Sequence, residues 1–251
     1  MVPGRGASRL PDVRAALDLL GRDVAGLLAA APAPSRPVIV GTAVLAAGCV
    51  AYRPTWRVLR HVATIVHEGG HAGVAALAGR RLRGVRLHSD TSGLTVSAGR
   101  PTGPGVVLTL LAGYLAPSAL GLLAAAAVGA GRVVPVLWAA IALLVALLVM
   151  IRNLFGVLSV LVTAAVLVAV AGWAPPAWQS PAGYLLTWFL LLAAPRPVIE
   201  LQRSRRRGLA SASDADQLAG LTRLPGLFWV GVFLLLTLAA LATGTWLLAL
   251  R

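Results

Sequence analysis

The chain has no lysine, one cysteine and only eight acidic residues among its 251 residues. The lone Cys49 excludes a disulfide framework within the chain, and it also excludes metal sites of the CxxC or cysteine-rich type. Any metal ion must therefore be held by histidine and carboxylate side chains. The four histidines and the eight acidic residues are the candidates for that role.

Charged side chains make up 12% of the chain and hydrophobic ones 58%, a balance that soluble domains do not show. We therefore expect an integral membrane protein surrounded mainly by the lipid bilayer. A net charge of +14 is also typical of nucleic-acid-binding proteins. However, all 22 basic residues are arginines, and they lie mainly between the apolar runs. Membrane topology explains this charge, so no nucleic-acid partner is expected.

A membrane-spanning helix needs about 20 mostly apolar residues. One helix over the roughly 40 residues from 133 to 172 would reach about 60 Å, so Arg152 and Asn153 mark a break. We predict an all-α polytopic membrane protein with about six to seven transmembrane helices. The seven apolar stretches are 37–52, 60–79, 104–129, 133–150, 153–172, 181–195 and 226–250.

The remaining segments divide the chain into an N-terminal part, 1–36, and a membrane-embedded domain, 37–251. Apolar residues at helical spacing predict an amphipathic interfacial helix over 11–30. No cleavable signal peptide is expected, since the first long apolar run begins only near Pro37. Alternation over 83–96 predicts a small β-hairpin after the second span. The stretch 196–225 is expected to be a basic loop followed by a short capped helix.

The distribution of arginines predicts an orientation. With seven spans and a cytoplasmic N-terminus, seventeen of the 22 arginines face the cytoplasm and five face the other side. This asymmetry is the one that the positive-inside rule describes. We therefore expect a multi-pass protein of the cell (plasma) membrane with its N-terminus in the cytoplasm.

The segment His67-Glu68-Gly69-Gly70-His71 carries the strongest chemical signal in the chain. Residues four apart share one face of a helix, so both imidazoles can bind one metal ion. Catalytic zinc commonly takes three protein ligands and a water molecule whose pKa it lowers to about 7. Glu68 follows the first ligand by one residue and is the candidate general base for that water. Ionisable groups inside a membrane helix usually mark a functional site.

These residues and their surroundings resemble the site-2 protease family of intramembrane zinc metalloproteases. The resemblance rests on HEGGHAGVAALAGRRLRGVRL, on the turn that follows it and on LAGYLAPS, and it is best over residues 60–125. It implies a short β-structured segment beside the site. It also implies a zinc cofactor and cleavage of a membrane-protein substrate in or near a transmembrane segment.

The third zinc ligand has to be found elsewhere. The family's usual third ligand is an aspartate in an Asn-Pro-Asp-Gly type motif, which this chain lacks. Ser213-Asp214-Ala215 resembles an element of a divergent, B-like branch, and this resemblance implies Asp214 as the ligand. An aspartate in the first turn of a helix is equally well explained as a capping residue. Asp216 is the reserve candidate.

Asn153 is the candidate for substrate binding. In the family resemblance, Arg152 to Gly156 take the place of the missing motif, so Asn153 would supply a hydrogen bond to the substrate. A simple helix break at Asn153 explains the same residue.

The leading functional hypothesis is therefore a zinc metalloendopeptidase with zinc-bound water as nucleophile and Glu68 as general base. The hairpin could accept an unwound substrate segment by strand addition. The alternative is a non-proteolytic zinc-binding scaffold of the same fold. The missing Asn-Pro-Asp-Gly type motif favours this alternative, whereas the intact Glu68 argues against it. A transporter would need polar residues along several spans, which these runs lack.

Overall fold

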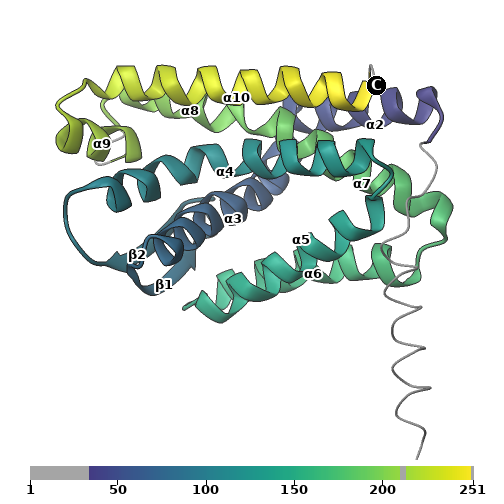
Figure 1. Ribbon diagram of the computed structural model, residues 1–251, viewed down its shortest axis with the longest axis horizontal. Helices are drawn as coiled ribbons and strands as arrows, with labels where there is room; N and C mark the ends of the chain where they lie inside the picture. Colours follow the sequence, from purple (N-terminus) through teal and green to yellow (C-terminus); the bar gives the residue numbers. More distant parts are fainter. Residues whose placement is uncertain (1–33, 210–212, 250–251) are drawn as a thin grey trace, which may run out of the picture.

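The computed structural model describes residues 34–209 and 213–249, and it is almost entirely helical (Figure 1). The amphipathic segment predicted over 11–30 lies outside these residues. Each of the seven apolar stretches becomes a helix or part of one. Five helices are long and apolar enough to cross a membrane, and a bent pair can supply a sixth crossing. The prediction of an all-α polytopic membrane protein is therefore confirmed, at the lower end of the predicted number of spans.

The bent pair consists of α2 (Arg36–Ala51) and α3 (Arg53–Leu77), which meet at an angle of 98°. Tyr52 between them has an extended backbone, and Pro54 cannot donate a backbone hydrogen bond at the start of α3. The Thr55 hydroxyl donates to the Cys49 carbonyl at 2.8 Å and so satisfies a backbone acceptor at the break. The α2–α3 pair is one broken span or a re-entrant segment, whereas the sequence predicted two complete spans.

The other long helices run back and forth beside this pair. Gly131 turns the chain between α4 (Pro104–Gly129) and α5 (Val133–Met150). Residues 151–153 separate α5 from α6 (Leu154–Trp173), at the break that the sequence predicted. The long α7–α8 helix is nearly continuous across Ala194, and together its parts cover 31 residues. These helices are α4 (Pro104–Gly129), α5 (Val133–Met150), α6 (Leu154–Trp173), α7 (Pro176–Ala193), α8 (Pro195–Arg206) and α10 (Gly226–Ala249).

The region 196–225 differs in part from the sequence prediction. Residues 196–206 were predicted as a basic loop but belong to α8, because arginine is a good helix former and Arg196 pairs with Glu200 one turn later, at 3.2 Å. The short capped helix is present as α9 (Asp214–Thr222). It lies at the same end of the bundle as the hairpin (Figure 1).

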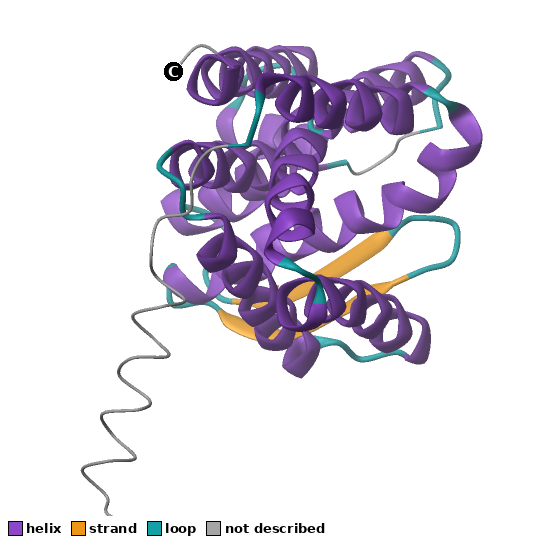
Figure 2. Cartoon of the chain, turned by 90° about the vertical axis from the view of Figure 1, so that its right-hand side faces the viewer, coloured by secondary structure: helices purple, strands orange, loops and turns teal. Residues whose placement is uncertain are grey.

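The predicted hairpin consists of β1 (Arg81–Leu87) and β2 (Gly93–Ala98), which pair antiparallel (Figure 2). The outer edge of β1 is occupied by the segment between α5 and α6. There Val85 pairs with Ile151 in parallel, and its carbonyl accepts from the Arg152 N–H at 2.8 Å. The hairpin is thus fixed to the helical bundle on its β1 side.

A seam of small residues brings α3 and α4 together. A methyl group on Gly70 would lie only 2.8 Å from the Ala112 carbonyl oxygen, so a side chain there would push the helices apart. The glycine pair of the HEGGH segment therefore has a packing role at Gly70. This close approach brings α4 directly against the histidine face of α3.

Candidate metal centre

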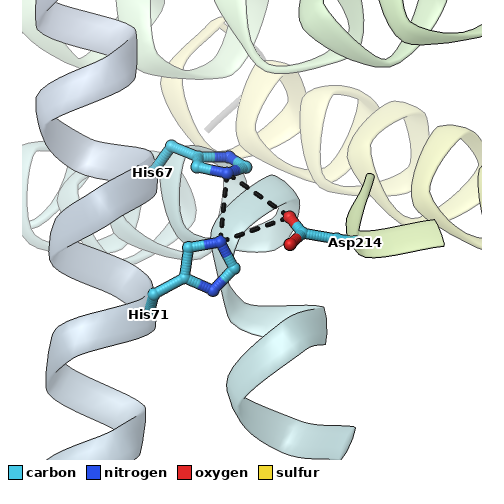
Figure 3. A group of neighbouring side chains, drawn as sticks. All are labelled: His67, His71 and Asp214. Atoms are coloured by element: carbon cyan, nitrogen blue, oxygen red, sulfur yellow. Dashed lines mark hydrogen bonds and ion pairs between the residues drawn. The ribbon is translucent and has the colours of Figure 1, made fainter. Parts of the chain in front are cut away.

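His67 and His71 occupy consecutive turns of α3 and point to the same place (Figure 3). Their Nε2 atoms are 3.1 Å apart. The Asp214 carboxylate reaches this place from α9, with Oδ2 3.4 Å from His67 Nε2 and 3.2 Å from His71 Nε2. The fold thus brings together the two residues of the motif and the aspartate that the resemblance implied.

The spacing of these three atoms suits a zinc ion. Zinc binds imidazole nitrogen and carboxylate oxygen at about 2.0–2.2 Å in tetrahedral geometry, which puts neighbouring ligand atoms about 3.3 Å apart. The three separations of 3.1, 3.2 and 3.4 Å match one face of such a tetrahedron. The fourth corner is left for a water molecule or a substrate. His67, His71 and Asp214 therefore fit a catalytic zinc site. The sequence predicted that histidine and carboxylate side chains would hold such an ion.

Residues of α4 fix the orientation of both imidazoles. His71 Nδ1 is 2.7 Å from the Thr109 carbonyl oxygen, which can only accept a hydrogen bond. Nδ1 therefore carries the proton in the neutral ring, and Nε2 presents its lone pair to a metal. The Tyr114 ring packs edge-on against His67, with centroids 4.8 Å apart. Gly113 lies over both rings, and a methyl group there would be 2.7 Å from His67 Cε1.

The position of Asp214 is set by the cap of α9. Ser213 is the N-cap residue, and its side chain and that of Asp216 form a reciprocal capping box. Asp216 also pairs with Arg205 of α8. The capping role thus falls to Ser213 and the reserve candidate Asp216, and the Asp214 carboxylate is left to face the histidines. Burial would raise the pKa of Asp214, but hydrogen bonds to His67 and His71 and their charges hold it well below its usual value.

Glu68 points toward the hairpin. Its side chain is buried, with 4% of the residue exposed, and its Oε2 accepts a hydrogen bond from the Thr95 hydroxyl of β2 at 2.6 Å. A side chain on Gly93 would overlap the Glu68 carboxylate, so β2 passes directly beside it. The hairpin therefore holds the predicted general base in one orientation.

Asn153 lies apart from the histidine cluster. Its Nδ2 donates to the Leu87 carbonyl at 2.6 Å, and its Oδ1 accepts from the Leu87 N–H at 3.1 Å. It is also the N-cap residue of α6. The structure thus uses both ends of its amide to join the hairpin to the bundle, in agreement with the helix-break alternative. Its role in substrate binding stays a prediction.

The other polar candidates also lie outside the cluster. His61 packs its ring against Phe155, with centroids 5.4 Å apart, and His88 and Asp90 belong to the hairpin turn. Sequence reasoning missed Thr95, Thr109 and Tyr114, which contact the motif from other elements. Of these three, only Tyr114 lies in a segment on which the family resemblance rests, LAGYLAPS, which also contains Gly113.

Of three comparisons with known proteins, one gave a match. The comparison with curated proteins and the comparison with solved structures gave no match. The profile of the Peptidase M50B-like family matches residues 40–244, a range that contains both histidines, Glu68 and Asp214. This range covers most of the chain and nearly all of its described helices. The chain therefore belongs to the Peptidase M50B-like family and to the site-2 proteases, as its HEGGH segment and the residues around it predicted.

Proposed function

We propose that this peptidase is an intramembrane zinc metalloprotease that hydrolyses a peptide bond in or near a transmembrane segment of a membrane protein. The observation that carries the proposal is the convergence of His67, His71 and Asp214 at tetrahedral ligand spacing, with Glu68 next to His67 in the sequence of α3. The two histidines lie on a helix of the membrane part, and His71 is six residues, or about 9 Å, from its end near the hairpin.

His67, His71 and Asp214 would hold the zinc ion. When bound, zinc supplies Lewis-acid chemistry, polarising a peptide carbonyl and lowering the pKa of a water molecule. Glu68 would accept the proton of the attacking water and pass it to the leaving amine. Thr95 would keep the Glu68 carboxylate aimed correctly, since its hydroxyl donates to Oε2 at 2.6 Å.

The free edge of β2 would bind the substrate backbone. Val85 and Leu87 direct backbone groups away from β2, toward residues 152 and 153. In an antiparallel pair, two directly opposed residues either bond to each other or both direct their backbone N–H and C=O groups away from the partner strand. The partners Thr95 and Gly93 must therefore point their backbone groups away from β1, while the same two residues adjoin Glu68 on one face of the hairpin. An extended substrate segment that adds to β2 would lie next to the general base.

The arginines support one orientation in the membrane. Those in the hairpin, at the end of α8 and between α9 and α10 lie at one end of the bundle, whereas Arg36 begins α2 and Arg132 is the N-cap residue of α5 at the other (Figure 1). We propose that the hairpin end faces the cytoplasm in the plasma membrane. Because α2 begins at the opposite end, the predicted cytoplasmic N-terminus requires α2 and α3 to cross separately, whereas a single broken crossing would place Ser35 outside.

The proposal is tested with purified protein in proteoliposomes that contain a panel of tagged single-span membrane proteins. Zinc content and cleavage are measured for wild type, Glu68→Gln, His71→Ala and Asp214→Ala. We expect Glu68→Gln to keep zinc and lose cleavage, and the two ligand variants to lose both. His61→Ala is the matched control, because this histidine on the same helix lies outside the cluster.

The outcomes separate the two functional hypotheses. Full cleavage by Glu68→Gln would exclude the protease mechanism. Stoichiometric zinc in wild type without cleavage of any substrate would favour the non-proteolytic scaffold. Zinc and cleavage retained in Asp214→Ala would show that another group is the third ligand, while the protease assignment would survive.

A further inference from the structure

A basic cavity lies beside the candidate metal centre. Its volume is about 770 Å³, and Tyr114, whose ring packs against His67, forms part of its wall. The cavity lies between the start of α3 and the length of α8. Its charged lining consists of Glu200 and five arginines: Arg53, Arg60, Arg196, Arg203 and Arg207.

The Glu200 carboxylate already pairs with neighbouring side chains. It forms ion pairs with Arg60 at 3.4 Å and with Arg196 at 3.2 Å, and it accepts a hydrogen bond from the Trp56 indole N–H at 2.9 Å. The guanidinium of Arg196 also lies over the Trp56 ring, 4.6 Å from its centroid. One carboxylate therefore serves two of the five arginines, and the cavity keeps an excess of positive charge.

The other three arginines have no such partner. Over residues 34–209 and 213–249, no ion pair or side-chain hydrogen bond joins Arg53, Arg203 or Arg207 to another group. Arg53 is the first residue of α3 and lies at the bend of the broken span. All three residues are exposed rather than buried against a carboxylate, so their positive charges act on whatever occupies the cavity. Three arginines around one cavity thus indicate an anionic ligand.

A second, mainly apolar cavity indicates that the ligand also has an apolar part. It has a volume of about 380 Å³ and shares Arg196, Glu200 and Arg203 with the basic cavity. The rest of its wall is mainly apolar and comes from Val50 and its neighbours on α2 and from Leu192 and Ile199 on the α7–α8 helix. A basic cavity that adjoins an apolar one across these shared residues suits an anion attached to a hydrocarbon chain.

We propose that the two cavities together bind an anionic phospholipid. The phosphate lies among Arg53, Arg203 and Arg207, and an acyl chain follows the apolar cavity along α2. An acidic peptide would satisfy the arginines but would leave the apolar cavity without an occupant. The proposal does not depend on the proteolytic activity, because none of these arginines belongs to the metal centre.

The test uses the full chain purified in detergent and titrated with single lipids, with binding read by native mass spectrometry. Phosphatidylglycerol is compared with phosphatidylcholine of the same acyl chains and with soluble glycerol phosphate. We expect phosphatidylglycerol to bind on the order of 100-fold more tightly than phosphatidylcholine, or about fivefold per arginine. Arg53→Gln/Arg203→Gln/Arg207→Gln should abolish this preference.

A matched control variant has the same loss of charge elsewhere. Arg81→Gln/Arg83→Gln/Arg86→Gln removes three exposed arginines of β1 and should keep the preference. Equal loss in both triple variants would mean a general charge effect and would overturn the proposal. If the first variant does not fold, Arg203→Gln/Arg207→Gln, in the last turn of α8 and at its C-cap, should still lower the preference by at least tenfold.

A further variant tests the lipid against a simple anion. Ala51→Trp fills the apolar cavity, and we expect it to weaken phosphatidylglycerol binding at least fivefold without changing glycerol phosphate binding. Binding of glycerol phosphate or of an acidic peptide as tightly as the lipid would contradict the proposal, because the hydrocarbon chain would then contribute nothing.

Discussion

Arg205, at the end of α8, forms an ion pair with Asp216, two residues after the candidate ligand Asp214. It also lies 3.4 Å from the Ser213 hydroxyl of the same cap. The cap therefore connects the position of the Asp214 carboxylate to α8, so a residue outside the candidate metal centre helps to place one of its candidate ligands.

We predict that Arg205→Gln lowers zinc affinity. Groups that orient a metal ligand typically contribute about 10- to 100-fold in affinity, so a loss in this range is expected. Chelator competition on the purified protein measures it. Arg206→Gln is the control, because this neighbouring arginine is exposed. An Arg205→Gln affinity equal to that of wild type would show that α9 holds Asp214 in place without the ion pair.

Gly113→Ala should displace the imidazoles. A methyl group at this position would lie 2.7 Å from His67 Cε1 and would overlap the His71 ring. Because alanine favours helix by about 1 kcal/mol over glycine, the substitution should not unfold α4. We expect at least about a tenfold loss of zinc affinity, in line with other residues that orient metal ligands. Gly231→Ala, a helical site with open space around it, should keep zinc; equal behaviour of the two variants would exclude the proposed contact.

Thr95→Val should slow cleavage and leave zinc content unchanged. The valine keeps the shape of the side chain but cannot donate to Glu68 Oε2, which the threonine hydroxyl reaches at 2.6 Å. A hydrogen bond to a charged group contributes about 1.5–3 kcal/mol, so the rate should fall about 10- to 100-fold. Thr95→Ser keeps the hydroxyl and should restore most of the rate. Loss of zinc in Thr95→Val would point to a structural role instead.

Asn153→Ala tests whether this side chain contacts substrate or only the hairpin. Because its amide makes two hydrogen bonds to Leu87, we expect the substitution to lower the free energy of unfolding by about 1–3 kcal/mol. Thermal unfolding measures this effect. A large rise in KM without a change in stability would instead support the substrate-binding role.

Cysteine labelling tests the bent pair. With Cys49 replaced by serine, single cysteines are placed at Ser35 before α2, Ser89 in the hairpin turn and Ala130 between α4 and α5. If α2 and α3 cross the membrane once, an impermeant maleimide should label the Ser35 and Ala130 positions from one side and the Ser89 position from the other. Labelling of Ser35 and Ser89 from the same side would instead restore the topology with a cytoplasmic N-terminus.

The composition and the apolar runs were sufficient to predict the helical membrane fold, and the alternation over 83–96 was sufficient for the hairpin. The sequence separated α2 from α3 but did not predict the angle between them, because hydropathy does not report direction: two apolar helices joined at Tyr52 have the same composition whether they cross twice or bend by 98°. Likewise, the run of arginines predicted a loop over 196–206 because of its charge, whereas the helix propensity of arginine favours the observed α8.

The two histidines could be predicted because their spacing alone fixes their geometry on a helix. Asp214 could be suggested only by resemblance, since its distance from His71 depends on how α9 packs against the bundle. The capping box is formed by Ser213 and Asp216, so the Asp214 carboxylate faces the histidines instead, and this division of roles depends on side-chain directions. Thr95 and Thr109 act on the site from β2 and α4, and no local pattern identifies such contacts.

The candidate ligands come from distant parts of the chain. Helices α4, α5, α6 and the long α7–α8 helix lie between His71 and Asp214 in the sequence. An ion bound by both would close a large loop and lower the entropy of the unfolded chain, as a disulfide does. In a protein whose single cysteine cannot form an internal bridge, the catalytic ion would thus also be a cross-link. Loss of the metal would free α9 from α3, so zinc supply would govern the lifetime of the folded protein as well as its activity.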